Sequence, residues 1–534
     1  MSDTLTVIEG GARTKPRLRL AELVAALSLG IDLGFGQPME HVLRQCLIAL
    51  RLGELIELSE QERLDVYYTA LLVNVGCHTD AHEQAKWFGD DIATKAAKYD
   101  VDMRSISGMV NGMRMLGSGS APLHRFRIGM EFFLYGHKDV DGMVESHSRL
   151  ARALASELGL PAAVQDSVGT AYERWDGRGW PGELKGSRIP LASRVAQMAE
   201  FIEVAHRVGG LDAATKLATE RAGTQFDPQL CRVLVDHSDS VLGMLDDCQT
   251  WDAVIAAEPS LMLTLTQEQA EAALIGVADF VDLKSPYTLG HARAAADLAT
   301  ATATSLALSP AECALTRHAV IVHGFGRLGV SNAIWDKPGP LAAGERERVR
   351  MHPYFTERML SQSQWLAPLG VVAVQLRERL DGSGYPRGVD GSRISMPARI
   401  LAAADVYQSM IEPRPYRSAR SPGEAAQQLR AEVSANRLDG DAVEGVLAAA
   451  GHAAMRRREH PAGLTSREID VLRLLARGLS SRQISERLVI APKTARNHIE
   501  HIYTKIGATS RVTASMFAVK NGLLPESTYV AEDA

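Results

Sequence analysis

The chain has 534 residues, enough for roughly three or four domains, and its 46% hydrophobic and 23% charged content is that of an ordinary globular protein. Its net charge of −6 excludes nucleic-acid binding through bulk charge, so any basic surface must be local. The sequence lacks the apolar run of about 18 residues that a transmembrane helix needs, and it lacks the features of a signal peptide. Its five cysteines form no CxxC pair, which is typical of free thiols in a reducing compartment. We therefore expect a cytoplasmic protein that does not engage a membrane.

The residue pattern along the chain predicts an all-α protein. Residues 1–17 are polar, and we expect them to be disordered. From Leu18 onward the sequence is rich in Ala and Leu at helical spacing, and extended runs of β-branched residues are scarce. The fold class that follows is a series of helical bundles.

An internal repeat organises the chain up to residue 455. Residues 172–206 and 377–411 share a D-G-x-G-aromatic-P motif, followed by G-S-R-I and a helical stretch. Three separations also recur in both halves. A separation of 29 residues joins His147 to Asp176 and His352 to Asp381, and one of 24 joins Asp176 to Glu200 and Asp381 to Asp405. A separation of 33 residues joins His41 to Asn74 and His291 to Gly324. We infer two copies of one helical domain, over residues 18–255 and 265–455.

A third and smaller helical domain follows the repeats. Residues 456–463 predict a linker into a domain over residues 464–526. Ser480 and Gln483 form a capping-box pattern at the start of a short helix, just after a turn at a glycine. A longer helix begins near Pro492 and carries an apolar stripe (Ala495, Ile499, Ile502, Ile506). Short helices joined by a tight turn predict a helix-turn-helix.

The longer helix also carries a polar face, formed by Lys493, Arg496, Asn497 and Glu500, that suits DNA. This face starts at the helix N-terminus, which meets base edges in helix-turn-helix proteins, and Arg and Asn can pair with guanine and adenine. Residues 464–524 hold ten Lys or Arg and four Asp or Glu, a local charge of +6. We expect double-stranded DNA as a partner, and a homodimer, because one such unit reads only one half-site. The alternative is a solvated basic bundle without a DNA role.

This C-terminal segment resembles the LuxR-type helix-turn-helix family over about 60 residues. The matching features are L-T-x-R-E at the start, A-x-G-x-S at the turn, Q-I-S, K-T-x-R-x-H in the longer helix, and K-I-G-x-x-S-R at the end. The resemblance implies that Arg496 and Asn497 face bases, and that Lys493 and Thr494 are placed to contact phosphates.

The second repeat resembles the HD-GYP family of metal-dependent phosphohydrolases, whose best-known substrate is cyclic di-GMP. The match covers about 170 residues and includes D-G-x-G-Y-P at 381–386, A-D-V-Y at 404–407 and R-P-Y-R at 414–417. It implies an all-α HD bundle in which His and Asp side chains bind two or three metal ions. Such ions activate a water molecule to attack a phosphodiester.

Several ligands that the resemblance implies are missing from this sequence. The positions that match are His291, His323, His352 and Asp405. The positions that differ are Gly324 for an Asp, Leu376 and Arg377 for a His-His pair, and Arg327 for a Lys. The first repeat departs further, with Val73 and Asn74 for His-Asp, Ala171 and Tyr172 for His-His, and Glu200 for Asp. These losses leave too few donors for a dinuclear centre, so we expect no catalytic residues.

Three fates remain open for the matching histidines. They are relics packed in the bundle, or they hold a residual mononuclear metal site with His291, His323 and Asp405 as ligands, or they support hydrolysis. We expect no cofactor apart from that residual divalent ion, and we expect a small nucleotide as a ligand. The predicted function is a DNA-binding transcription regulator whose catalytically impaired HD-type domains act as a sensor or a dimerisation module. The alternative is a metal-dependent phosphohydrolase, acting on a cyclic dinucleotide or another phosphoester, with a DNA-binding tail.

Overall fold

The computed structural model of the protein describes residues 17–102, 105–118, 122–132, 137–245, 248–259, 263–453, 461–464, 466–488, 492–521 and 523. The described residues form helices and contain no named strand, which confirms the all-α prediction. They divide into two compact units, Met1–Ala450 and Gly451–Ala534. Most of the N-terminal stretch that we expected to be disordered, and most of the expected linker at 456–463, lie outside the described residues. Of the described helices, none is both long enough and apolar enough to cross a membrane.

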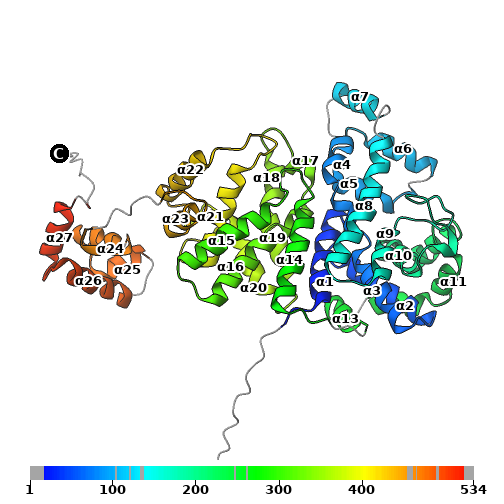
Figure 1. Cartoon of the computed structure of the whole chain (residues 1–534), viewed down its shortest axis with the longest axis horizontal. Helices are drawn as coiled ribbons and strands as arrows, with labels where there is room; N and C mark the ends of the chain where they lie inside the picture. The colour runs from blue at the N-terminus through cyan, green and yellow to red at the C-terminus, as the bar shows by residue number, and fades with distance from the viewer. Residues whose placement is uncertain are drawn as a thin grey trace, which may run out of the picture. The chain divides into compact units, whose positions relative to one another are not determined.

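The first unit contains both sequence repeats (Figure 1). The helices of the first repeat are α1 (Leu20–Gly34), α2 (His41–Leu55), α3 (Glu60–Leu72), α4 (Ala81–Phe88), α5 (Asp91–Ala96), α6 (Ile106–Met115), α7 (Pro122–Glu131), α8 (His137–Glu157), α9 (Ala162–Gly169), α10 (Leu191–Arg221), α11 (Pro228–Asp236), α12 (Ser238–Leu242) and α13 (Thr250–Ala256). Those of the second are α14 (Gln267–Asp282), α15 (His291–Ser305), α16 (Pro310–Val322), α17 (Asn332–Trp335), α18 (Ala343–Arg350), α19 (His352–Leu360), α20 (Ala367–Ala373), α21 (Met396–Ile411), α22 (Pro422–Ser434) and α23 (Gly440–Ala449). Short 3-10 turns that carry site residues are η1 (Val75–His78), η2 (Ala97–Tyr99), η6 (Phe325–Gly329) and η7 (Val374–Arg377).

The two repeats begin their histidine-bearing helices in the same way. The residue before α2 and the residue before α15 both adopt the left-handed conformation, Glu40 at φ 82° and Gly290 at φ 71°. In each repeat a buried carboxylate of the preceding helix accepts a hydrogen bond from the backbone N–H of the second residue of the new helix. Val42 donates to Asp32 at 3.0 Å, and Ala292 donates to Asp282 at 2.9 Å. Capping boxes start α3 and α16 alike. Equal sequence spacing therefore corresponds to equal local structure.

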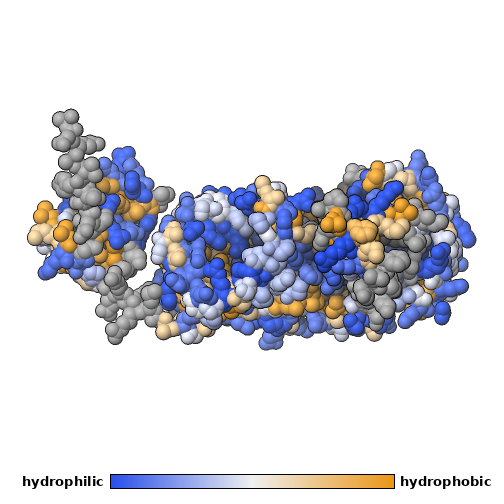
Figure 2. Space-filling model, turned by 90° about the horizontal axis from the view of Figure 1, so that it is seen from above, coloured by the Kyte–Doolittle hydropathy of each residue, from blue (hydrophilic) through white to orange (hydrophobic). Residues whose placement is uncertain are grey.

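The repeats share one core instead of folding as separate bundles. Buried apolar residues from Leu18 to Leu447 belong to a single cluster. Helix α1 of the first repeat packs on η6 and α19 of the second, and a Cβ added to Gly30 would lie only 2.5 Å from Met359 Cε. A buried carboxylate, Asp91, accepts hydrogen bonds from Lys284 and Ser331 of the other repeat. Because the apolar side chains are packed inside, the face of this unit shown in Figure 2 is largely hydrophilic.

The second unit is a four-helix domain with its own core. Its helices are α24 (Ser466–Ala476), α25 (Ser481–Leu488), α26 (Pro492–Ile506) and α27 (Arg511–Lys520). Ala495 and Ile502 are buried, and the other two residues of the predicted stripe pack at the edge of the core. Ser480 and Gln483 exchange the two hydrogen bonds of a capping box at the start of α25. Arg511 fixes the preceding turn by donating to the carbonyl oxygen of Gly478 at 2.9 Å.

Candidate functional site

The second repeat brings together the three residues that the sequence singled out as a residual metal site. His291 is the first residue of α15, His323 follows α16, and Asp405 lies in the middle of α21. Asp405 Oδ1 lies 3.2 Å from His291 Nε2 and 3.4 Å from His323 Nε2. All three side chains are buried, and their ligand atoms lie within 4.8 Å of one another. Within the described residues no other group of three such side chains is gathered this tightly.

Hydrogen bonds at the far side of each ring orient these histidines. His291 Nδ1 lies 2.8 Å from Glu412 Oε2, and His323 Nδ1 and His352 Nδ1 face backbone carbonyl oxygens. Such partners orient the imidazole rings, as they do around bound metals. Burial alone would lower the pKa of His291, but Asp405 and Glu412 raise it to about 9. Burial and Arg377 lower the pKa of His352 to about 3.

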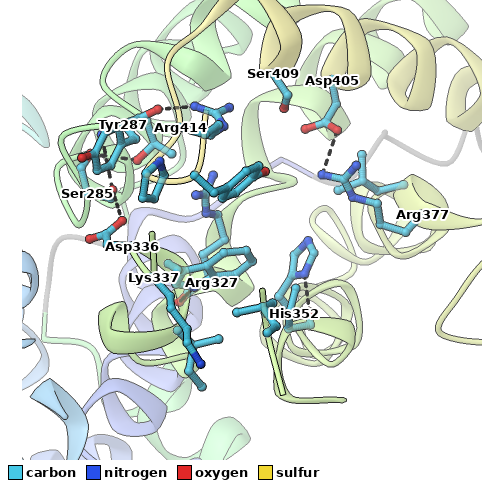
Figure 3. A pocket seen from close by; sticks show the side chains of 18 of the residues that line it. Ser285, Tyr287, Arg327, Asp336, Lys337, His352, Arg377, Asp405, Ser409 and Arg414 are labelled. Carbon is cyan, nitrogen blue, oxygen red and sulfur yellow. Dashed lines mark hydrogen bonds and ion pairs between the residues drawn. The ribbon is translucent and has the colours of Figure 1, made fainter. Parts of the chain in front are cut away.

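A guanidinium group lies against the carboxylate of this cluster (Figure 3). Arg377 Nη2 is 3.1 Å from Asp405 Oδ2. Although burial opposes ionisation, Arg377 and the two neighbouring histidine rings hold the pKa of Asp405 well below its usual value. A fixed cation therefore neutralises the carboxylate to which the family resemblance assigns a metal-binding role.

The donor set fits one divalent ion and does not fit two. Two Nε2 atoms and one carboxylate oxygen can hold a single metal. The positions that would complete a second site carry Gly324, which has no donor, Leu376, which is buried and apolar, and Arg377, which is cationic. A second cation would be repelled by the guanidinium at short range.

A cavity of about 320 Å³ opens beside the cluster, and its lining is rich in cations and aromatic rings. His323, His352 and Asp405 form part of its wall. The cationic lining residues are Arg327, Lys337, Arg377 and Arg414, and the aromatic ones are Tyr287, Trp335 and Tyr416. The motif R-P-Y-R pointed to Arg414 and Tyr416, whereas no sequence signal marked Tyr287, Trp335 or Lys337. Several positive groups with flat rings favour an anionic ligand that carries a base.

The corresponding place in the first repeat is closed by a lysine. Lys98 Nζ lies 2.5 Å from Glu200 Oε1, and the same carboxylate oxygen accepts hydrogen bonds from Asn74 at 2.6 Å and Tyr99 at 2.7 Å. Although burial would raise the pKa of Glu200, Lys98 and these donors lower it. The ammonium group pairs with the carboxylate, and the described residues of this repeat offer no cluster of metal-ligating side chains like that of the second repeat.

The residues expected to contact DNA are together on one exposed surface. Lys493, Thr494, Arg496, Asn497 and Glu500 all lie between the start and the middle turn of α26, within Pro492–Glu500, and are exposed. The buried residues of the helix face the domain core, so the exposed face is available to a groove. The structure leaves their individual roles as predictions.

Comparisons with known proteins agree with both parts of the chain. An HD domain model matches residues 138–230 and 276–442, and a model of the bacterial regulatory proteins of the luxR family matches residues 462–518. The 3'3'-cGAMP-specific phosphodiesterase 3 of Vibrio cholerae is 32% identical over 404 residues, which are 75% of this chain and 88% of the relative. A cyclic di-GMP phosphodiesterase response regulator of Xanthomonas campestris is 35% identical over 119 residues, 22% of this chain and 32% of the relative. A solved cyclic GMP-AMP specific phosphodiesterase from V. cholerae has 27% identity and a TM-score of 0.57, over 82% of this chain and 98% of its own.

The chain belongs to the HD-domain family that includes these phosphodiesterases. It combines tandem HD-GYP-like repeats with a C-terminal LuxR-type helix-turn-helix domain.

Proposed function

We propose that the protein is a transcription regulator whose second HD domain binds a cyclic dinucleotide as a signal and does not turn it over efficiently. The observation that carries the proposal is the Arg377–Asp405 ion pair at 3.1 Å, within the cluster formed by His291, His323 and Asp405. It places a guanidinium group beside the carboxylate to which the family resemblance assigns a metal-binding role.

The cavity chemistry supports a phosphodiester ligand. Arginine pairs with phosphate oxygens through two parallel N–H groups, and Arg327, Arg377 and Arg414 all line the same space. Tyr287 and Trp335 supply ring faces on which a base can stack, a contact worth about 1–3 kcal/mol per base. The relatives named above are phosphodiesterases of cyclic GMP-AMP or cyclic di-GMP, so a cyclic dinucleotide is the ligand class of choice.

Efficient hydrolysis is disfavoured by the donor count. If one divalent ion binds, His291, His323 and Asp405 would hold it, and it would polarise a phosphate oxygen or a water molecule. The residues of a two-metal clamp are replaced by Gly324 and Arg377, which leaves the remaining phosphate oxygens to arginine contacts. Arginine holds phosphate charge but supplies no hydroxide.

The output of this sensor is the C-terminal domain. We propose that Arg496 and Asn497 read bases, that Lys493 and Thr494 bind phosphates, and that Glu500 lies beside them on the same face. We also propose a homodimer, because a domain of this type binds one half-site and paired half-sites need a two-fold protein.

Calorimetric titration of the full chain with 3'3'-cGAMP and with cyclic di-GMP, in the presence of EDTA, tests the proposal. We expect metal-independent binding that Arg377→Ala weakens by about tenfold or more, since a charge-assisted phosphate contact is lost. Arg430→Ala is the matched control, because Arg430 pairs with Glu444 on α23, outside the cavity. Binding that needs a divalent ion, or no binding of either nucleotide, would contradict the proposal.

The second candidate function is a phosphodiesterase with a DNA-binding tail. It is favoured by the 32% identity across 88% of a cGAMP-specific enzyme and by the ordered His291–His323–Asp405 cluster. Robust turnover with Mn²⁺ or Fe²⁺ that is lost in His323→Ala or Asp405→Ala would establish this function in place of the sensor.

A further inference from the structure

Within the first repeat, a thiol, an imidazole and a carboxylate lie in a row, and none of the three lines the cavity of the second repeat. Cys77 Sγ lies 3.7 Å from His147 Nδ1 and 2.7 Å from Tyr172 Oη. On the other side of the ring, His147 Nε2 lies 2.7 Å from Asp80 Oδ2. Cys77, His147 and Asp80 are buried and come from η1, α8 and the residue before α4. A base held by an acid beside a sulfur atom is the arrangement that activates a nucleophile.

The electrostatics of this cluster set Cys77 apart from other buried cysteines of the chain. Burial alone would raise the pKa of the Cys77 thiol, but His147 and Lys98 outweigh burial and lower it. The pKa of His147 is raised to about 10, because Cys77 and Asp80 stabilise its charged form against burial. In contrast, burial raises the pKa of Cys231 to about 12 and that of Cys46 further still. Of these three thiols, Cys77 is the one whose pKa is lowered, so its surroundings favour the thiolate form.

Access to the sulfur atom is narrow. Tyr172, whose hydroxyl touches Cys77 Sγ, also lines a cavity of about 90 Å³ together with Ala171 and Trp180. Cys77 itself is 7% exposed, and its sulfur atom touches Tyr172, one of the side chains that line that cavity. This limited exposure favours a small neutral oxidant, such as hydrogen peroxide, over a nucleotide or a peptide.

We propose that Cys77 is a peroxide-reactive thiolate and a second input to the protein, independent of any nucleotide. Its sulfur attacks one oxygen of hydrogen peroxide, so that an S–O bond forms and the O–O bond breaks. The hydroxide that leaves takes the proton of the His147 imidazolium and departs as water. Cysteine is thereby oxidised to sulfenic acid and peroxide is reduced to water, while Asp80 holds the ring in position.

Oxidation of Cys77 would change hydrogen bonds around the Lys98–Glu200 pair. The new hydroxyl group must be accommodated where Cys77 touches Tyr172 at 2.7 Å. The Tyr172 hydroxyl also lies 3.5 Å from Asn74 Oδ1, and Asn74 donates to Glu200 at 2.6 Å. Oxidation therefore perturbs the hydrogen bonds that close the first repeat around its lysine.

The test treats the folded full-length protein with a small excess of hydrogen peroxide, removes the peroxide, unfolds the protein in denaturant that contains dimedone so that the trap reaches every sulfenic acid, and maps each cysteine by mass spectrometry. We expect Cys77 to be oxidised at least about tenfold faster than Cys248 and Cys313, although both are more exposed, because His147 lies beside the Cys77 sulfur and stabilises its thiolate. The other cysteines thus serve as controls within one molecule, and this ranking needs no variant.

Two variants test the roles of the neighbours. His147→Gln and Asp80→Asn should slow the labelling of Cys77 by about tenfold or more while Cys248 and Cys313 keep their rates. Far-ultraviolet circular dichroism checks that both variants are folded. Labelling of Cys248 or Cys313 before Cys77 in the wild-type protein would overturn the proposal, and so would an unchanged Cys77 rate in a folded His147→Gln protein.

Discussion

Lys98 pairs with Glu200 in the first repeat at 2.5 Å, at the carboxylate position that corresponds by spacing to Asp405 in the second. Asp405 has its own protein cation, Arg377, at 3.1 Å. The two cations come from unrelated positions, one from η2 and one from η7. Each repeat has thus met the same requirement, the neutralisation of a buried carboxylate, with a different side chain.

Arg377→Ala should raise the affinity for Mn²⁺ by about tenfold or more, because it frees Asp405 from a competing cation beside two oriented histidines. Calorimetric titration of metal-stripped protein measures the change, and Arg430→Ala is the control for loss of a positive charge. An unchanged or weaker affinity in Arg377→Ala would show that the guanidinium does not compete with a metal.

The wild-type protein should show no measurable cyclic di-GMP hydrolysis with Mn²⁺, Fe²⁺ or Mg²⁺. Gly324→Asp alone should also be inactive, because Leu376 and Arg377 still stand where two histidines are needed. Product formation followed by chromatography is the measurement. Turnover by Gly324→Asp would show that one restored carboxylate is sufficient.

Lys98→Met should lower the free energy of unfolding of the first unit by about 3–5 kcal/mol, because it leaves the buried Glu200 carboxylate without a charge partner. The double variant Lys98→Met with Glu200→Gln should recover much of that loss. All six tryptophans lie before residue 451, so tryptophan fluorescence during urea denaturation reports on this unit. Lys216→Met, at an exposed ion pair with Glu220, is the control and should change little.

Asp32 should make stability fall as pH rises. Burial raises its folded-state pKa to about 7 from 3.8, so its stabilising contribution is complete below pH 3.8 and is lost as pH rises through about 7. The change is on the order of 4 kcal/mol across that window. Asp32→Asn should remove this part of the pH dependence in denaturation series from pH 4 to 8, whereas Asp236→Asn, at an exposed position, should keep it. Parallel curves for wild type and Asp32→Asn would contradict the assignment.

DNA binding by the full chain should fall steeply with salt, because phosphate contacts release counterions. Arg496→Ala and Asn497→Ala should each reduce discrimination between specific and unrelated DNA by about 1–3 kcal/mol. Lys493→Ala should weaken all sequences about equally and lower the salt slope, whereas Lys520→Ala, at the end of α27, should do neither. Equal effects from Arg496, Asn497 and Lys493 would show that the base-reading face is assigned wrongly.

Sedimentation velocity should show a homodimer at micromolar concentration, with or without DNA. The expectation follows from the need for two half-site readers related by a two-fold axis. A monomer under both conditions would mean that the paired arrangement is supplied in another way.

Local patterns in the sequence determined the helices and their order. Ser480 and Gln483 start a helix where the pattern predicts, because a capping box depends only on residues three positions apart. The resemblance to the HD-GYP family implied that His291, His323 and Asp405 belong to one site, and the structure brings their ligand atoms within 4.8 Å of one another. The roles of the DNA-facing residues of α26 stay predictions.

Tertiary structure alone decided which cation meets which carboxylate and that the two repeats share one core. Lys98 and Glu200 are about a hundred residues apart in the sequence. The repeated spacing does not include Lys98, because the segment between η1 and α8 that contains it has no counterpart of equal length in the second repeat. The cavity likewise draws Tyr287 and Trp335 from segments without a motif. A side chain so far from its partner in the chain is placed by packing, and packing depends on the shape of the whole core and not on any local period.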